Sequence, residues 1–457
     1  MQTLKNIIQV IIANISGYGV SIIIGFFLPL VLPIDDYGYY RQFILYAGYI
    51  YVLNVGFNDG IYKKYGGKEP LDIDKREINS EKNFIVFFHL LVSLFIFIIA
   101  IINNNNIWLL LAMSNFFTNT NSFYENIFVA TGQFQHYSRI GMLNSFFYVV
   151  FLLIGIFVLK EKSYIFYIGL LLFINFLQFL SYEIVFSNLF DRKFVFTFNG
   201  KLPLFKKGLL LSLANLLYGS VSTVGNFIIN NNFSIEIFAQ YSFQASLVNV
   251  LLRIANAVGN VFYNLISKIS GFDFIQKSKK ILILISILLG AFYFPMKFLI
   301  SIVLPEYNYA ASMIAYTFIS LPFLIISRVI ISNLYRSKVP ELHFFLESML
   351  LAGVSSVLIY LGYKLTNSPE VIAILTSFSY FAWYFYCTEY KFKNLRNDKD
   401  DLSNLFSFLI IFWLCSSIFN TKIGFIIYIL YTLIILKRSR DLLGPQVKKI
   451  IKFSKIG

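Results

Sequence analysis

Long runs of apolar residues, separated by short polar segments, dominate this sequence of 457 residues. A helix rises 1.5 Å per residue, so about 20 apolar residues cross a hydrocarbon core roughly 30 Å thick. The chain is therefore expected to be an all-α polytopic membrane protein. The apolar runs predict about fourteen transmembrane helices, near residues 7–33, 43–62, 83–102, 107–130, 140–159, 164–186, 208–230, 239–266, 281–304, 311–335, 342–363, 370–390, 404–420 and 423–436.

The composition and the placement of charge agree with this architecture. Hydrophobic residues make up 58% of the chain and charged residues 13%, against roughly 25% charged residues in soluble domains. The net charge of +15 would suggest nucleic acid in a soluble protein. Here 30 of the 38 basic residues fall in the loops and tails on one side of the predicted spans. Because cytoplasmic loops hold the Lys and Arg, both termini are predicted to be cytoplasmic.

The sequence lacks the features of most enzymes. The longest connections between spans, residues 63–82 and 187–207, are too short for a soluble domain, and no phosphate-binding G-x-x-x-x-G-K-[ST] motif occurs. The two cysteines lie inside predicted spans, and the three histidines have no metal-ligand spacing. The first apolar run is too long for a cleavable signal peptide and is predicted to be a signal anchor. No catalytic residue, cofactor or metal is expected, and the pattern favours transport.

An internal repeat of about 200 residues suggests two halves. Ala13 and Asn14 correspond to Ala214 and Asn215, and the turn after the first span recurs near residue 236. The predicted parts are an N-terminal lobe of six spans (1–190), a cytoplasmic linker (191–207), a C-terminal lobe of six spans (208–392), a further hairpin (402–440) and a basic cytoplasmic tail (441–457).

Polar residues recur at helical spacing inside several spans. Polar groups are costly in hydrocarbon, so such a stripe must face other helices or a water-filled cavity. Both alternatives remain open, although six polar groups on one face exceed what helix packing needs. One stripe lies on the predicted eighth span, at Ser242, Ser246, Asn249, Arg253, Asn256 and Asn260, and another on the seventh, at Ser212, Asn215, Gly219, Ser222, Asn226 and Asn230.

Arg253 is the charge that most needs an explanation. It lies near the middle of its span, where an unpaired charge costs about 2.5–3.5 kcal/mol on insertion scales. We expect it to meet an anion in a wet cavity, since its planar group suits phosphate or carboxylate; the alternative is a structural pair with an acid such as Glu125. Lys297 and Arg328 lie nearer the ends of their spans, where long side chains reach the interface.

Two motifs and the repeat resemble a known family. The motifs are D-Y-G-Y-Y at residues 36–40 and G-F-x-x-G-I-x-K-K at residues 56–64. Together with the repeat near residue 214, they resemble the polysaccharide transporters, which are the O-antigen and capsule-repeat flippases of the multidrug/oligosaccharidyl-lipid/polysaccharide exporter superfamily. The resemblance implies two six-helix lobes around a central cavity.

The resemblance also implies a substrate and the residues that bind it. The expected activity is flipping of undecaprenyl-pyrophosphate-linked oligosaccharides to the outer leaflet by alternating access, for O-antigen, lipopolysaccharide or capsule assembly. Membrane lipids are implied partners, and a glycan polymerase and chain-length proteins are candidate partners. Asp59 and Glu125 are candidates for ion coupling. The implied substrate-binding residues are Arg253, Arg328 and Lys297 for pyrophosphate, Asn14, Asn54, Asn215, Asn249 and Asn256 for sugar hydroxyls, and Tyr18 and Tyr51 for sugar rings.

Three alternatives belong to other functional classes. A multidrug or metabolite antiporter on the same fold would favour a cavity rich in carboxylates, whereas the deepest charge here is positive. A membrane-embedded glycan polymerase or ligase would expose a catalytic arginine or carboxylate on an outer loop, and those loops are short. A structural scaffold would not need the polar stripe of the eighth span.

Overall fold

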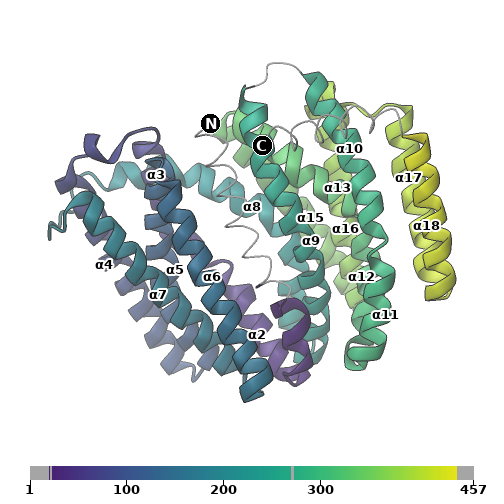
Figure 1. The fold of residues 1–457 in the computed structure, drawn as a ribbon, viewed down its shortest axis with the longest axis horizontal. Helices are drawn as coiled ribbons and strands as arrows, with labels where there is room; N and C mark the ends of the chain where they lie inside the picture. Colours follow the sequence, from purple (N-terminus) through teal and green to yellow (C-terminus); the bar gives the residue numbers. More distant parts are fainter. Residues whose placement is uncertain (1–19, 21–22, 269–271, 440–457) are drawn as a thin grey trace, which may run out of the picture. The chain divides into compact units, whose positions relative to one another are not determined.

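The structure is a computed structural model that describes residue 20 and residues 23–268 and 272–439; the side chains of residues 253–272 lie outside the description. Every regular element in these residues is a helix (Figure 1). Within these described residues, eight helical stretches are long and apolar enough to cross a membrane, and a bent pair of helices adds a ninth. The predicted all-helical membrane protein is confirmed for the described part of the chain. The number of fourteen spans remains a prediction.

The chain forms two compact units. Unit 1 comprises Met1–Ser242 and Glu341–Ala352, and unit 2 comprises Phe243–Pro340 and Gly353–Gly457. The predicted lobe and linker boundaries remain predictions. The unit boundaries fall within α9 (Ile235–Lys268) and α15 (Glu341–Thr366). The other helices of unit 1 are η1 (Ile23–Phe27), η2 (Leu28–Leu30), α2 (Ile34–Ala47), η3 (Ile50–Asn54), α3 (Phe57–Tyr65), η4 (Pro70–Asp72), α4 (Lys75–Ile102), α5 (Asn106–Ala130), α6 (Phe134–Leu153), η5 (Ile154–Leu159), α7 (Tyr164–Phe190) and α8 (Leu202–Asn232).

Unit 2 contains the bent span, in which the chain turns by 62° between Pro305–Phe318 and Leu321–Lys338. Its other helices continue the chain in order to residue 438. They are α10 (Phe272–Gly290), α11 (Tyr293–Val303), η6 (Pro305–Tyr307), α12 (Asn308–Phe318), α13 (Leu321–Ile326), η7 (Ser327–Ile331), α14 (Ser332–Lys338), α16 (Pro369–Phe385), η8 (Tyr386–Lys391), η9 (Lys393–Leu395), α17 (Lys399–Trp413), η10 (Leu414–Ile418) and α18 (Thr421–Arg438).

Polar caps mark where several helices begin. Asn105 accepts hydrogen bonds from the backbone N–H groups of Ile107 and Trp108 at the start of α5, and Asn420 accepts one from Ile423 at the start of α18. Asp398 and Asp401 form a reciprocal capping box on α17. These side chains satisfy amide groups that a helix cannot pair internally. Polar residues in the short connections between apolar runs therefore cap the helices that follow them.

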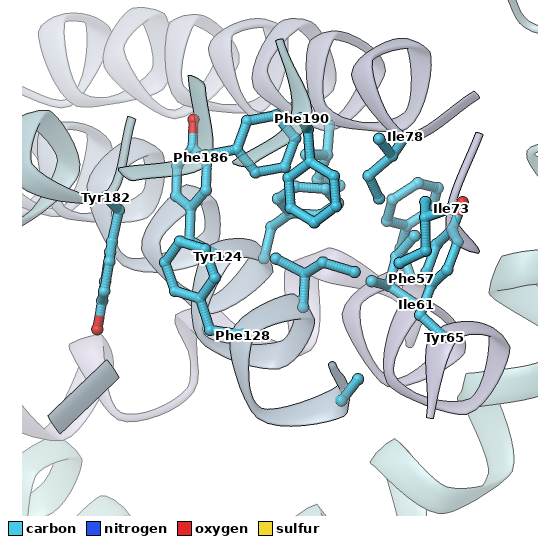
Figure 2. Packing of buried hydrophobic residues seen from close by; sticks show 14 of the residues in the cluster. Phe57, Ile61, Tyr65, Ile73, Ile78, Tyr124, Phe128, Tyr182, Phe186 and Phe190 are labelled. Carbon is cyan, nitrogen blue, oxygen red and sulfur yellow. The ribbon is translucent and has the colours of Figure 1, made fainter. Parts of the chain in front are cut away.

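An aromatic core holds one end of unit 1 together. In Figure 2 the side chains of Tyr124, Phe128, Tyr182 and Phe186 gather where α5 meets α7. The rings of Tyr124 and Phe186 lie 5.5 Å apart in an edge-on arrangement, which aromatic pairs favour over face-to-face stacking. The α4 helix, which packs against α5, instead exposes large apolar side chains along its C-terminal half. That exposed surface suits contact with lipid.

The predicted second span is interrupted. After α2 the chain forms the short 3-10 helix η3, and Val55 and Gly56 then adopt left-handed conformations with φ of 52° and 79°. Glycine tolerates this conformation readily, whereas a β-branched residue adopts it only when its surroundings impose it. We name residues 48–56 the helix-2 break.

A close helix crossing supports the helix-2 break from one side. Gly56 and Gly60, spaced as in a G-x-x-x-G motif, lie against the start of α8. A Cβ atom on Gly208 would lie 1.9 Å from the carbonyl oxygen of Gly56, and one on Gly60 would lie 2.1 Å from the carbonyl oxygen of Leu204. Only glycine therefore allows α3 and α8 to pack at this separation.

Candidate functional site

Polar side chains of unit 1 gather around the helix-2 break. The hydroxyl of Tyr51 donates a hydrogen bond of 2.6 Å to Oδ2 of Asp59, which joins η3 to α3 across the left-handed residues. The amide of Asn54 donates to the carbonyl oxygen of Tyr51 at 2.6 Å. Asn54 is fully buried, while Tyr51 and Asp59 are half-buried. Three residues that the sequence assigned to substrate or ion binding thus lie together.

A chain of amide groups extends from the break into α5 and α4. Asn58 donates to the carbonyl oxygen of Asn119 at 3.1 Å, and Asn119 donates to Oδ1 of Asn115 at 2.9 Å. Asn115 in turn donates to Oγ of Ser93 at 2.9 Å. Asn115 and Asn119 of the fourth predicted span therefore face other helices of unit 1.

The polar stripe on α8 is only partly available for a ligand. Asn230 donates to the hydroxyl of Tyr46 on α2 at 2.9 Å, and the hydroxyl of Ser242 donates to Oδ1 of Asn226 at 3.4 Å. These bonds support the helix-packing alternative for the C-terminal half of the stripe. Nearer the N-terminus of α8, Ser212 is buried and Asn215 is half-buried.

Glu125 lies apart from the helix-2 break, between α5 and α7. Its Oε1 accepts hydrogen bonds from Nε2 of Gln178 at 3.0 Å and from the hydroxyl of Tyr182 at 3.2 Å. A second carboxylate, Glu183, lies on the same helix pair and forms an ion pair of 2.8 Å with Lys82. Both neighbours donate to the same carboxylate oxygen, and the role of Glu125 in ion coupling remains a prediction.

Two of the predicted cationic residues lie in unit 2. Arg328 is half-buried on the π-helical turn η7, within the second half of the bent span. The amine of Lys297 lies 3.5 Å from the carbonyl oxygen of Ser416 and 5.7 Å from the centre of the Tyr293 ring. These two contacts stabilise the charged amine of Lys297 within an apolar helix.

The remaining predicted site residues are less defined. Asn249 is exposed on α9. Asn14 and Tyr18 lie outside the described residues, and so do the side chains of Arg253 and Asn256, whose backbone belongs to α9. Both the anion-binding role of Arg253 and its alternative pairing with Glu125 therefore stay predictions.

Unit 2 also contains an apolar groove of about 360 Å³. It lies where α12 and α13 meet α16 and α17, and its surface is almost entirely apolar. Such a lining suits hydrocarbon and offers little to a sugar or a phosphate. The aromatic side chains along it are Tyr316, Phe323, Phe378, Phe381 and Trp413.

Some residues that shape these sites gave no functional signal in the sequence. The continuous apolar run 43–62 concealed the helix-2 break, although the pair Val55-Gly56 lies within it. The spacing of Gly56 and Gly60 was a usable signal for close packing. The buried ion pair of Lys279 with Asp401, 2.9 Å apart in unit 2, joins residues too distant in sequence to be paired by pattern.

Comparison with solved structures identifies membrane transporters. The chain is similar to a lipid II flippase, MurJ, in an inward-closed conformation, at 15% identity, with 95% of this chain and 100% of that chain covered and a TM-score of 0.68. It is also similar to a multidrug resistance MATE family transporter of the MOP superfamily, in an outward-facing conformation (13% identity, 88% and 96% covered, TM-score 0.57). The inward-facing conformation gives 15% identity, 89% and 96% coverage and a TM-score of 0.54.

No family model and no curated protein matches the sequence. At the identities above, the structural likeness concerns the fold, and it extends over nearly the whole chain. The chain is therefore a multi-pass membrane protein that shares its fold with flippases and multidrug transporters of the MOP exporter superfamily.

Proposed function

We propose that this protein flips undecaprenyl-pyrophosphate-linked oligosaccharides from the cytoplasmic to the outer leaflet of a bacterial inner membrane, for O-antigen or capsule assembly. The observation that carries the proposal is the full-length likeness in fold to a lipid II flippase. Because fold alone does not define a substrate, the choice of substrate rests on the residues. The deepest charge in the predicted spans is the cation Arg253, which suits an anionic headgroup.

The substrate has two parts with opposite requirements. The pyrophosphate and sugars need a polar path, because they cannot cross hydrocarbon unpaired. Arg253 and Arg328 are the proposed pyrophosphate ligands, with Lys297 a weaker one, and Asn215 and Asn249 are proposed for the sugars. The prenyl tail needs an apolar surface, which the aromatic groove of unit 2 supplies. Rocking of the two halves would expose the headgroup site alternately to each side, as in other transporters built from repeats.

A multidrug antiporter is the second candidate, and the likeness to MATE transporters favours it. Organic cations are attracted by carboxylates and aromatic faces, and the Tyr51–Asp59 pair provides both. A flippase would therefore bind its anionic substrate through cationic residues, whereas an antiporter would bind organic cations through carboxylates. Loss of Arg253 should abolish glycan flipping but spare cation export.

The first test is surface glycan display in cells that depend on this chain for it. We expect Arg253→Ala to abolish display at near-normal protein level and Arg253→Lys to restore it in part, because lysine keeps the charge without the planar fork. Lys268→Ala, at the end of the same helix, is the matched control and should display normally. Normal display with Arg253→Ala would remove Arg253 from the site. Loss of the protein itself would indicate a buried ion pair instead.

A further inference from the structure

The connection between α7 and α8 contains aromatic and basic residues that the proposed transport function does not use. Residues 191–202 have the sequence D-R-K-F-V-F-T-F-N-G-K-L, and all but the last form neither helix nor strand. We name them the 191–202 strap. Phe194 is 89% exposed, Phe198 66% and Leu202 64%. Three large apolar side chains exposed within one short connection indicate a surface that contacts a partner or a membrane.

Polar side chains at the start of α4 hold the strap in place. Asn79 and Asn83 lie one turn apart on α4. Asn79 donates to the carbonyl oxygen of Asp191 at 3.0 Å, and Asn83 donates to that of Val195 at 2.9 Å. These hydrogen bonds fix the path of the strap backbone along α4. The exposed ring of Phe194 therefore belongs to a segment that the protein positions.

Two ring contacts place the strap at the level where the hydrocarbon begins. The rings of Phe196 and Phe87 lie 5.3 Å apart, and those of Phe198 and Phe84 lie 5.9 Å apart, both edge-on. Phe84 and Phe87 lie near the start of the predicted span 83–102, and Phe87 is itself exposed. The strap therefore lies beside the membrane boundary of α4, where amphipathic segments rest with aromatic side chains inserted.

The charge around the strap suits an anionic surface. Residues 191–207 include five basic residues and one acidic residue. The acidic residue, Asp191, already pairs with Lys75 of α4 at 2.7 Å, whereas Arg192 and Lys193 are exposed. Basic residues next to a membrane attract anionic lipid headgroups. The strap thus combines apolar side chains for acyl chains with cations for phosphate groups.

We propose that the 191–202 strap binds anionic phospholipid of the leaflet on the predicted cytoplasmic side. Phe194 and Phe198 insert between the acyl chains, and Arg192 and Lys193 bind the lipid phosphate groups. The depth of the strap favours lipid over a soluble protein, because the ring contacts with α4 lie at the start of a membrane span. Bound lipid anchors the connection between α7 and α8 to one leaflet, whichever substrate the protein transports.

Depth of insertion tests the apolar part of the proposal. The two natural cysteines, Cys387 and Cys415, are buried and are replaced by alanine. A single cysteine, Phe194→Cys, then carries an NBD fluorophore in full-length protein reconstituted into phosphatidylcholine–phosphatidylglycerol liposomes. The matched control is Glu69→Cys, exposed in the loop before α4. Lipids with a nitroxide on the acyl chain should quench the first label at least about twofold more strongly, because a side chain buried at the acyl boundary meets the quencher directly.

Headgroup selectivity tests the basic part of the proposal. The melting temperature of purified full-length protein in detergent is measured with added phosphatidylglycerol, phosphatidylcholine or inorganic pyrophosphate. We expect only phosphatidylglycerol to raise it. Arg192→Gln/Lys193→Gln should need about 30-fold more of this lipid for the same rise, since each basic group near an anionic surface contributes about fivefold. Lys160→Gln/Lys162→Gln, which removes two exposed charges from another connection, is the matched control and should respond like the wild type.

Folding of each variant is checked by its elution profile before the responses are compared. Equal quenching of the two labels would overturn insertion of the strap. An unchanged response of the folded Arg192→Gln/Lys193→Gln variant to phosphatidylglycerol would overturn the headgroup site. Stabilisation by pyrophosphate that equals that by phosphatidylglycerol would also overturn it, in favour of a site for free phosphate groups. Neither measurement contains glycan, so failure of the proposed function would leave both results unchanged.

Discussion

Substituting Gly208 by alanine tests whether the α3–α8 crossing supports the helix-2 break. The new Cβ atom would lie 1.9 Å from the carbonyl oxygen of Gly56 and 2.6 Å from the backbone nitrogen of Gly60. An ordinary contact begins near 3.4 Å, so the two helices must separate by roughly 1.5 Å. Both facing atoms belong to the backbone, so no side-chain rotation can relieve the clash.

The expected cost follows from a matched substitution on the same helix. At Gly219, a Cβ atom would have no neighbour within 4 Å. Replacing glycine by alanine gains helix propensity of about 0.5–1 kcal/mol at either position, and this gain cancels in the comparison. Overpacking at Gly208 should cost about 1–3 kcal/mol. Gly208→Ala should therefore be less stable than Gly219→Ala by about that amount.

Thermal unfolding of the two purified variants in the same detergent measures this difference. We expect Gly208→Ala to melt below the wild type and Gly219→Ala to melt at or above it. Transport should fall with Gly208→Ala alone, since only that change displaces the break. Equal melting temperatures for the two variants would refute the reasoning, because they would mean that α3 and α8 do not cross at the separation described.

Two further predictions concern unit 2 and the topology. Asp401→Ala leaves the fully buried Lys279 without its ion-pair partner, and it should lower the free energy of unfolding by about 3–5 kcal/mol. Asp400→Ala removes an exposed partner of Arg438 and should lower it by at most about 1 kcal/mol. Denaturation of the two purified variants measures both values. A cysteine at Asn104, in a predicted outer loop, should react with an impermeant maleimide in intact cells, and one at Asn199 should react only after permeabilisation. Labelling of Asn199→Cys in intact cells would contradict the predicted orientation.

Much of the architecture follows from hydrophobic patterning. Long apolar runs in a membrane form helices, because a helix satisfies its own backbone groups there. Most described residues of those runs are helical, with breaks such as the one at Val55 and Gly56. Short polar caps such as Asn105 and Asn420 also mark helix starts that a sequence can reveal. Patterning is therefore informative about where helices lie.

The candidate site was less accessible to the same reasoning. A hydropathy pattern cannot distinguish a continuous helix from one with left-handed residues, so the break at Val55 and Gly56 went unseen. The helical stripe on α8 predicted one polar face, but it did not reveal that Asn230 bonds Tyr46. These properties depend on which helices become neighbours, and that is set by tertiary packing.

Translocation by the purified protein tests the central proposal most directly. Full-length protein would be reconstituted into liposomes that contain a fluorescent undecaprenyl-pyrophosphate oligosaccharide, and an impermeant lectin would report the fraction of glycan on the outer surface. We predict protein-dependent translocation that Arg253→Ala abolishes and Lys268→Ala spares. Liposomes in which the folded protein exports organic cations but leaves the glycan in place would contradict the account and favour a multidrug antiporter.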